Sequence, residues 1–229
     1  DVMCNRPKVA AYRAPGAPIG SFALESCVDE LARELGIDPL RMREINGAKD
    51  GTKATHGVTW VNIGYQKTLE AARASEHMKI ALMPNQGRGI ASGYWHNAGG
   101  ESSAAVHVNE DGTVTVTEGH PDIGGSRASM AIMAAETLGV EYDQVRPIVA
   151  DTASVGYTHV TGGSRVTFAT GMAVVDASKK LVDELRCRAA MIWGVDPEGV
   201  IWEDGAAKPA SSNVGDFPPM PLKEIASKA

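Results

Sequence analysis

The sequence predicts an α+β fold in which packed helices accompany a mixed β-sheet and hairpin meander. Apolar residues at the 3.6-residue spacing of helices dominate the first third of the chain. Short alternating runs surround an Asp111-Gly112 turn signal in the middle. Later, two β-like runs each lead through a Gly-Gly-Ser-Arg loop into a helical run. This order indicates an α+β architecture rather than a regular array of βαβ units.

Residues 1–80 are expected to form a first segment of a strand, an arginine turn and helices. Gly36 is placed to end a helix, because glycine accepts the left-handed conformation common there. Asp38 and Pro39 are typical of the cap and first residue of the next helix. The helix before Gly36 has one apolar face, made of Leu24, Cys27, Val28, Leu31 and Leu35. The expected elements are a strand at 7–12, a breaker cluster at 13–18, helices at 19–35 and 39–46, a loop or short hairpin at 47–62 and a helix at 65–75.

Residues 81–229 are expected to form a second segment, a β-meander followed by two glycine loops with their helices. Gly194 is placed to end the longest helix of the chain. The tail is rich in loop residues and closes with a short helix. The expected elements are strands at 87–98, 102–109 and 113–118, a helix at 126–138, a strand at 145–151, a helix at 165–193 and a small hairpin within 195–207.

Composition excludes several classes of protein. The apolar fraction of 43% in 229 residues argues against disorder. A net charge of −6 argues against non-specific nucleic-acid binding, and no apolar run approaches the roughly 18 residues of a membrane span. The three cysteines form no CxxC pair, which argues against a disulfide framework or a zinc site. A reducing compartment fits best, so we expect the cytoplasm and leave the periplasm open.

The two Gly-Gly-Ser-Arg loops, at 124–127 and 162–165, have the materials of an anion site. Glycine lets a ligand approach the backbone, a helix N-terminus carries a partial positive charge, and arginine offers a fork suited to phosphate. A cruder version is the turn from Arg13 to Gly16. The alternative is that these loops are only turns, with serine as a helix cap. His120, just before the first loop, is expected to stabilise a turn, with a role as a site residue as the alternative.

Three stretches resemble the molybdopterin-binding subunit of the xanthine dehydrogenase/aldehyde oxidase family. They read KVAAYRAPGAPIGSFALESCVDELARELGIDPLRMREIN, NEDGTVTVTEGHPDIGGSRASMAIMAAETLG and TGGSRVTFATGMAVVDA. Their order and spacing agree with the family from about residue 7 to 205. The resemblance implies the fold of the molybdenum-cofactor-binding domain of molybdenum hydroxylases.

That family hydroxylates carbon with an oxygen from water, using molybdenum held by molybdopterin, with or without a cytosine dinucleotide extension. The resemblance implies that two loops from different parts of the chain clamp one elongated anionic cofactor. It implies no catalytic residue and no direct metal ligand in this chain. The implied substrate-pocket residues are Pro15, Tyr94 and Trp95. The implied cofactor-binding residues are Tyr12, Arg13, Ala14, Gly124, Gly125, Ser126, Arg127, Gly162, Gly163, Ser164 and Arg165.

Departures from the family pattern determine how much of the enzyme we expect this chain to represent. Gly125 stands where many relatives carry a glutamine, and the family's early glycine motif and late general-base glutamate lie outside this sequence. We therefore expect a middle portion of a large subunit, incomplete and inactive alone. Its expected partners are the rest of that subunit, an iron–sulfur subunit or domain, optionally a flavin subunit, and a small aldehyde or N-heterocyclic substrate. The alternatives are a non-catalytic module for a phosphate-containing ligand and a structural fragment.

Overall fold

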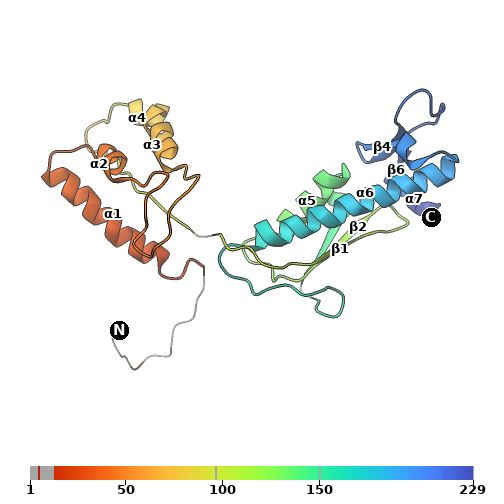
Figure 1. The fold of residues 1–229 in the computed structure, drawn as a ribbon, viewed down its shortest axis with the longest axis horizontal. Helices are drawn as coiled ribbons and strands as arrows, with labels where there is room; N and C mark the ends of the chain where they lie inside the picture. Colours follow the sequence, from red (N-terminus) through yellow and green to blue (C-terminus); the bar gives the residue numbers. More distant parts are fainter. Residues whose placement is uncertain (1–4, 6–12, 96, 150, 229) are drawn as a thin grey trace. The chain divides into compact units, whose positions relative to one another are not determined.

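A computed structural model describes residues 5, 13–95, 97–149 and 151–228 (Figure 1). The chain divides into two compact units, residues 1–95 and 96–229. The sequence placed a boundary at residue 80, but the following segment packs on the first unit. There, the Ser92 N–H donates to the Glu25 carboxylate at 2.7 Å, and the Ser92 hydroxyl lies 2.5 Å from that of Tyr65. The strand expected at 7–12, with Tyr12, lies outside the described residues.

The first unit is helical, as its periodicity predicts. The Asp38 carboxylate accepts a 2.8 Å bond from Arg41 N–H at the start of the second helix, and Gly36 is left-handed at the end of the first, so both end signals are confirmed. A single bridge between Lys53 and Thr59 makes the expected short hairpin. The helices are α1 (Ala17–Glu34), α2 (Pro39–Asn46), α3 (Tyr65–Ala74) and α4 (Glu76–Lys79).

Helix α1 buries one apolar residue, Ala32, and pairs with α2 through charged side chains. Arg43 of α2 is only 4% exposed. Its guanidinium bonds Glu25 at 2.6 Å and Asp29 at 2.9 Å, both on α1. The opposite, apolar side of α1 faces solvent, with Leu24 63% exposed and Leu31 and Leu35 also exposed. The apolar periodicity predicted the position of α1 but not which of its sides is buried. The ion pairs of Glu25 and Asp29 with Arg43 determine the buried side.

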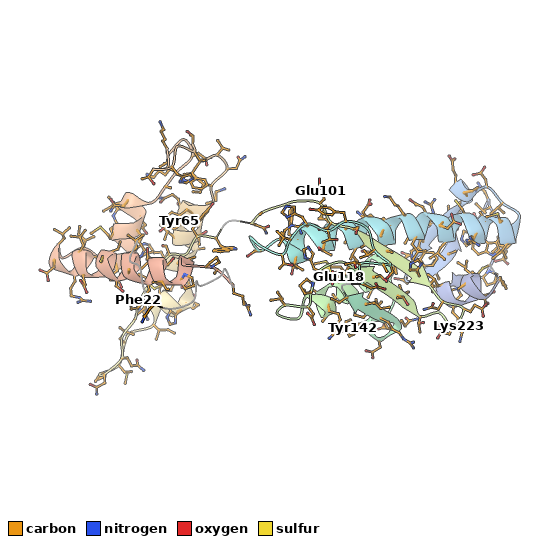
Figure 2. The ribbon with its side chains drawn as sticks, turned by 90° about the horizontal axis from the view of Figure 1, so that it is seen from below. Phe22, Tyr65, Glu101, Glu118, Tyr142 and Lys223 are labelled. Atoms are coloured by element: carbon orange, nitrogen blue, oxygen red, sulfur yellow. The ribbon has the colours of Figure 1, made fainter. Side chains whose placement is uncertain are left out.

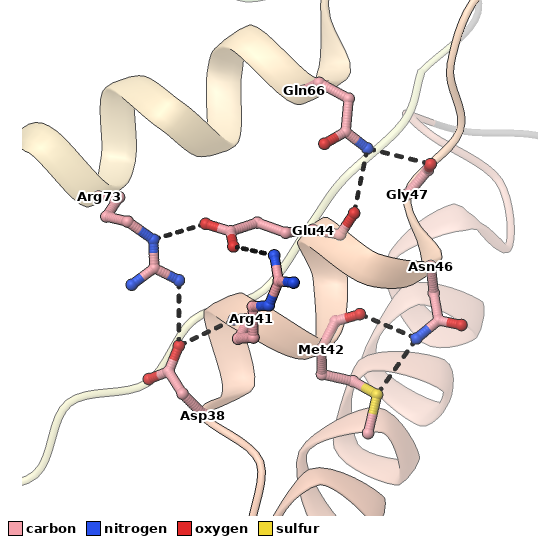
Figure 3. A network of polar contacts seen from close by, with 8 residues as sticks. All are labelled: Asp38, Arg41, Met42, Glu44, Asn46, Gly47, Gln66 and Arg73. Atoms are coloured by element: carbon pink, nitrogen blue, oxygen red, sulfur yellow. Dashed lines mark hydrogen bonds and ion pairs between the residues drawn. The ribbon is translucent and has the colours of Figure 1, made fainter.

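A second polar network fixes α2 against α3 (Figure 3). The Glu44 carboxylate of α2 accepts bonds from Arg73 of α3 at 2.5 Å and from Arg41 at 3.2 Å. The Gln66 amide of α3 donates to the Gly47 carbonyl at 3.0 Å, just after α2 ends. The side chains of one helix thus satisfy the end of the other, which sets their relative position.

The second unit is built on a three-stranded sheet in the order β1-β2-β3. Strands β1 (Ala104–Val108) and β2 (Val114–Glu118) pair antiparallel across the predicted Asp111-Gly112 turn. Helix α5 (Ser126–Leu138) carries the chain to β3 (Val145–Val149), which pairs parallel to β2. The fold is therefore a mixed sheet with packed helices, as predicted. All of these ranges agree with the sequence-based expectation to within two residues.

Helix α6 (Gly171–Trp193) runs along this unit (Figure 1) and packs against α5 and β1. The helix expected from 165 begins instead with one π-helical turn, Val166–Thr170. Gly194 ends α6 in the left-handed conformation, as predicted. Buried side chains from α5, α6 and the sheet make one core, which includes Val116, Met130 and Val174.

A second small sheet lies at the far end of α6. Its strands are β4 (Val200–Glu203), β5 (Ala206–Pro209) and β6 (Met220–Pro221), and α7 (Leu222–Ser227) follows. Strand β6 was not expected from the sequence. The strand expected at 87–98 was wrong: residues 87–95 and 97–98, the described part, hold none. Three glycines weaken strand formation there, and side chains such as Glu25 take up its backbone donors.

Helix α5 ends where the β4–β5 turn crosses it. A Cβ added to Gly139 would lie 2.6 Å from the backbone nitrogen of Gly205, and the Trp202 indole donates to the Leu138 carbonyl at 2.8 Å. Gly139 and Gly194 both end a helix at φ 70°, with ψ 32° and 35°. Among described atoms, however, nothing lies within 4 Å of a Cβ on Gly194. Substitutions at these two glycines therefore allow the cost of a left-handed backbone to be distinguished from the cost of close packing.

We predict that Gly139→Ala costs more stability than Gly194→Ala. The left-handed conformation alone costs an alanine roughly 1–2 kcal/mol, whereas forced overpacking adds about 1–3 kcal/mol. Urea unfolding of both variants measures the difference in the free energy of unfolding. Equal losses would contradict the assigned contact between the turn and the helix end.

Candidate functional site

The first Gly-Gly-Ser-Arg loop presents open backbone at the start of α5. Gly124 and Gly125 are both left-handed, at φ 71° and 82°, and α5 begins at Ser126. A Cβ built on Gly125 meets none of the described atoms within 4 Å. Asp122 caps the helix: its carboxylate accepts from Arg127 N–H at 3.2 Å and pairs with the Arg127 guanidinium at 3.4 Å. The arginine of this loop is therefore engaged by a carboxylate.

The second loop has the same four residues in a different conformation. Gly163 and Ser164 are left-handed, at φ 68° and 57°, so the left-handed pair lies one residue later in the motif than in the first loop. The Gly163 carbonyl accepts from Ala98 N–H at 2.7 Å, and a Cβ on Gly163 would lie 2.7 Å from the Ala98 Cβ. A Cβ on Gly162, in contrast, meets none of the described atoms within 4 Å. The second loop thus rests on chain segment 97–99 and exposes Gly162.

Arg165, at the end of the second loop, is 1% exposed and lies at the centre of a buried polar network. A guanidinium has five N–H donors, and here each has an acceptor. None is left to form a fork around a phosphate, so Arg165 supports the loop rather than facing an anion. The acceptors are the carbonyls of Gly99 (2.9 Å), His159 (2.7 Å) and Glu101 (2.6 Å), Ser102 Oγ (2.9 Å) and His120 Nε2 (2.7 Å).

His120 joins the two loops. It follows β2, lies four residues before Gly124 and is 1% exposed. Its Nε2 contacts Arg165, and its Nδ1 lies 2.7 Å from the hydroxyl of Thr161, the residue before the second loop. The expected turn-stabilising role was thus too narrow. Sequence reasoning missed the contact because its partners are 41 and 45 residues away.

Glu118, labelled in Figure 2, is a fully buried carboxyl at the end of β2. One oxygen accepts from His120 N–H at 2.6 Å, and the other has no hydrogen-bond partner among the described residues. Burial raises the pKa of Glu118, a bond from the His120 backbone opposes the shift, and the charge of Asp122 adds to it. Burial and the Arg165 charge lower the pKa of His120. Both groups thus favour their neutral forms.

The predicted residues of the first unit lie at two places on it. Arg13 and Ala14 hold left-handed conformations, at φ 39° and 53°, in the turn before α1, and Arg13 is exposed. Such conformations cost non-glycine residues free energy and are frequent at functional sites. Pro15, in the same turn, is also exposed.

Tyr94 and Trp95, at the end of the first unit, are 66% and 41% exposed. The Tyr94 ring meets Trp60 edge to face at 5.5 Å, and Trp60 meets His56 at 6.0 Å. This aromatic cluster of His56, Trp60 and Tyr94 was not foreseen. The sequence signal that could have revealed this cluster is an aromatic residue after a glycine turn, as in the stretch HGVTW.

The described ranges hold no group of three His, Cys, Asp or Glu residues placed to share a metal ion. Within the same ranges, no helix combines the length and the apolar character needed to cross a membrane.

Comparison with known proteins identifies relatives. Two models of the molybdopterin cofactor-binding domain match residues 1–47 and 61–229. The aldehyde oxidoreductase molybdenum-binding subunit PaoC of Escherichia coli K12 is 32% identical over 216 residues, 87% of this chain and 28% of that protein. Aldehyde oxidase 1 of Cavia porcellus is 29% identical over 88% of this chain and 16% of its own length. The chain thus spans less than a third of these relatives.

Among solved structures, quinoline 2-oxidoreductase from Pseudomonas putida 86 matches with a TM-score of 0.66. The match covers 91% of this chain and 29% of that one, at 21% identity. At this identity the likeness establishes the fold.

We predict that Glu118→Gln stabilises the cofactor-free protein at high pH. Because the folded-state pKa of Glu118 is raised, its stabilising contribution is present at low pH and is lost as pH rises through that pKa. The amide keeps the acceptor for His120 N–H and cannot ionise. The melting temperature of the variant should exceed that of the wild type at about pH 8, and the gap should narrow towards about pH 5.

His120 acts in the opposite direction, since its lowered pKa removes stability as pH falls below the ordinary imidazole range. The difference between variant and wild type isolates the Glu118 contribution. A gap that does not change with pH would refute the assigned pKa shift.

Proposed function

The chain belongs to the molybdopterin cofactor-binding domain family, in the xanthine dehydrogenase/aldehyde oxidase group, and on that premise we propose that its two Gly-Gly-Ser-Arg loops together hold one molybdopterin cofactor in a molybdenum hydroxylase. One observation carries this proposal: buried His120, just before the first loop, contacts both Thr161, the residue before the second loop, and Arg165, the last residue of the second loop. Loops 38 residues apart in sequence are thereby held in one place.

The first loop fits a group that approaches the backbone. Gly125 is left-handed and open, and the N–H groups of the first turn of α5 carry a partial positive charge. The backbone N–H groups of Gly124, Gly125 and Ser126 would hold a phosphate of the cofactor, while Arg127, paired with Asp122, would add a nearby positive charge. A side chain on Gly125 would occupy the space that the group needs. Gly125 stands where many relatives carry a glutamine. In this chain the Gly125 backbone would therefore contact the cofactor in place of a glutamine side chain.

The second loop contributes differently. Gly162 is open and Ser164 brings a hydroxyl to the turn, whereas Gly163 packs on Ala98. Arg165 fixes the orientation of this loop through its hydrogen bonds to the protein, and these bonds leave it no donor for the cofactor. When bound, molybdopterin supplies the redox-active molybdenum that the family uses to hydroxylate carbon.

The first unit contributes the arginine turn and the substrate side. Arg13, exposed in a strained turn with Ala14, would offer a cation to an anionic cofactor. Tyr12 is assigned to the same turn from the resemblance alone. Pro15, Tyr94 and Trp95 would line the substrate path, and exposed aromatic rings suit a small aldehyde or N-heterocycle.

The partners follow from the relatives. PaoC is a molybdenum-binding subunit, and this chain corresponds to 28% of it. We infer that the remaining parts of such a subunit, an iron–sulfur partner and, in some assemblies, a flavin partner complete the enzyme. The catalytic base and the electron path belong to those parts.

We predict that Gly125→Val in the full-length subunit abolishes most cofactor binding. The matched control is Gly51→Val, because Gly51 has φ 84° and is equally free of described atoms within 4 Å of an added Cβ, but lies outside the site. Both changes should cost about 1–2 kcal/mol of stability through the left-handed backbone. Only the first should lower molybdenum content, by about tenfold or more for a lost 1.4 kcal/mol of binding.

Molybdenum analysis and nucleotide release, with melting of the cofactor-free forms, measure both effects. Normal molybdenum content in Gly125→Val would defeat the proposal. Wild-type protein that binds inorganic phosphate at this loop, but no molybdenum, would favour the non-catalytic phosphate-binding alternative.

A further inference from the structure

We propose that His120 is a positioning residue for the cofactor site: its neutral ring, protonated on Nδ1, sets the second glycine loop against the start of the first. This inference rests on the proposed function and assigns a role to a residue outside both loops. His120 is buried, belongs to neither Gly-Gly-Ser-Arg motif, and contacts Thr161, just before the second motif, and Arg165, its last residue.

The hydrogen bonds determine the tautomer. A guanidinium only donates, so Nη1 of Arg165 at 2.7 Å requires a lone pair on His120 Nε2. The proton of the neutral ring is then on Nδ1, and it donates to the Thr161 hydroxyl at 2.7 Å. The remaining four donors of Arg165 are already used by other groups. The fifth therefore depends on the imidazole.

The backbone of His120 is fixed as firmly as its ring. Its N–H donates to the Glu118 carboxylate at 2.6 Å, at the last residue of β2. The His120 ring therefore sets the distance between the end of β2 and both ends of the second loop. Since the first loop continues from the same strand end, displacement of the ring changes the spacing of the two loops.

The charged and polar groups around the His120 ring and its partner Arg165 come from three segments. Glu118 and Asp122 belong to the end of β2 and the loop after it, Arg165 belongs to the second loop, and Glu101 and His159 face the guanidinium through their carbonyls. In the imidazolium form, the second proton, on Nε2, would put two N–H donors against each other. Burial and the nearby Arg165 charge, which lower the pKa of His120, keep that form rare at neutral pH.

The test uses the full-length subunit purified with its cofactor and compares His120→Gln with His120→Leu. Both side chains are close to histidine in volume, but only glutamine offers Arg165 an acceptor at the position of Nε2. The glutamine variant should keep molybdenum to within about twofold of wild type. The leucine variant should lose roughly tenfold, the size expected when a hydrogen bond to a charged group is removed.

Acid supplies a readout that packing alone would not move. Because burial and the Arg165 charge lower the pKa of His120, the wild type should release molybdenum over a step that begins only as pH falls below the ordinary imidazole range of about 6.5, and the glutamine variant should lack this step. Equal retention by the leucine and glutamine variants, or the same acid step in wild type and glutamine variant, overturns the proposal.

Nitrogen-15 NMR of the imidazoles in cofactor-free wild-type protein decides the matter if the variants do not fold. We expect the Nδ1-protonated neutral form of His120 at neutral pH, and an Nε2-protonated ring or an imidazolium overturns the proposal. Wild-type protein without any molybdenum would instead defeat the proposed function itself, and the positioning role with it.

Discussion

The second unit depends on one buried cation with every donor satisfied. A guanidinium is costly to remove from water, and it remains buried only where acceptors replace the lost hydration. Arg165 meets that condition through three carbonyls, one hydroxyl and one imidazole nitrogen. These acceptors come from residues 99–102, 120 and 159, so a single side chain reinforces three segments that the β1–β2 pairing and the bond from His159 N–H to the Glu101 carbonyl already bring together. The first unit also buries an arginine, Arg43, which is held by ion pairs with Glu25 and Asp29.

The two Gly-Gly-Ser-Arg loops show that identical letters need not give identical conformation. In the first, Asp122 caps α5 and engages Arg127 in solvent, so the two glycines take the left-handed positions. In the second, burial of Arg165 shifts the left-handed pair to Gly163 and Ser164. The two loops thus differ in structure: the first leaves its backbone open, whereas a buried arginine supports the second.

Local signals in the sequence predicted what local physics determines. Asp38 capped its helix, Gly36 and Gly194 ended theirs, and the Asp111-Gly112 turn set the hairpin. Contacts between distant residues were beyond such signals. The buried side of α1, the aromatic cluster around Trp60 and the link from His120 to Arg165 all depend on partners far along the chain. The proposed site residues come from the family resemblance, whereas the contacts of His120 with Thr161 and Arg165 come from the structure.

The central claim is that the two loops act on one cofactor. Hydrogen exchange, measured on the full-length subunit with and without bound cofactor, tests it most directly. If the claim is correct, amides of residues 123–127 and 161–165 gain protection together when the cofactor is bound, while those of the distant β4–β5 hairpin stay unchanged. Protection of one loop without the other would contradict it.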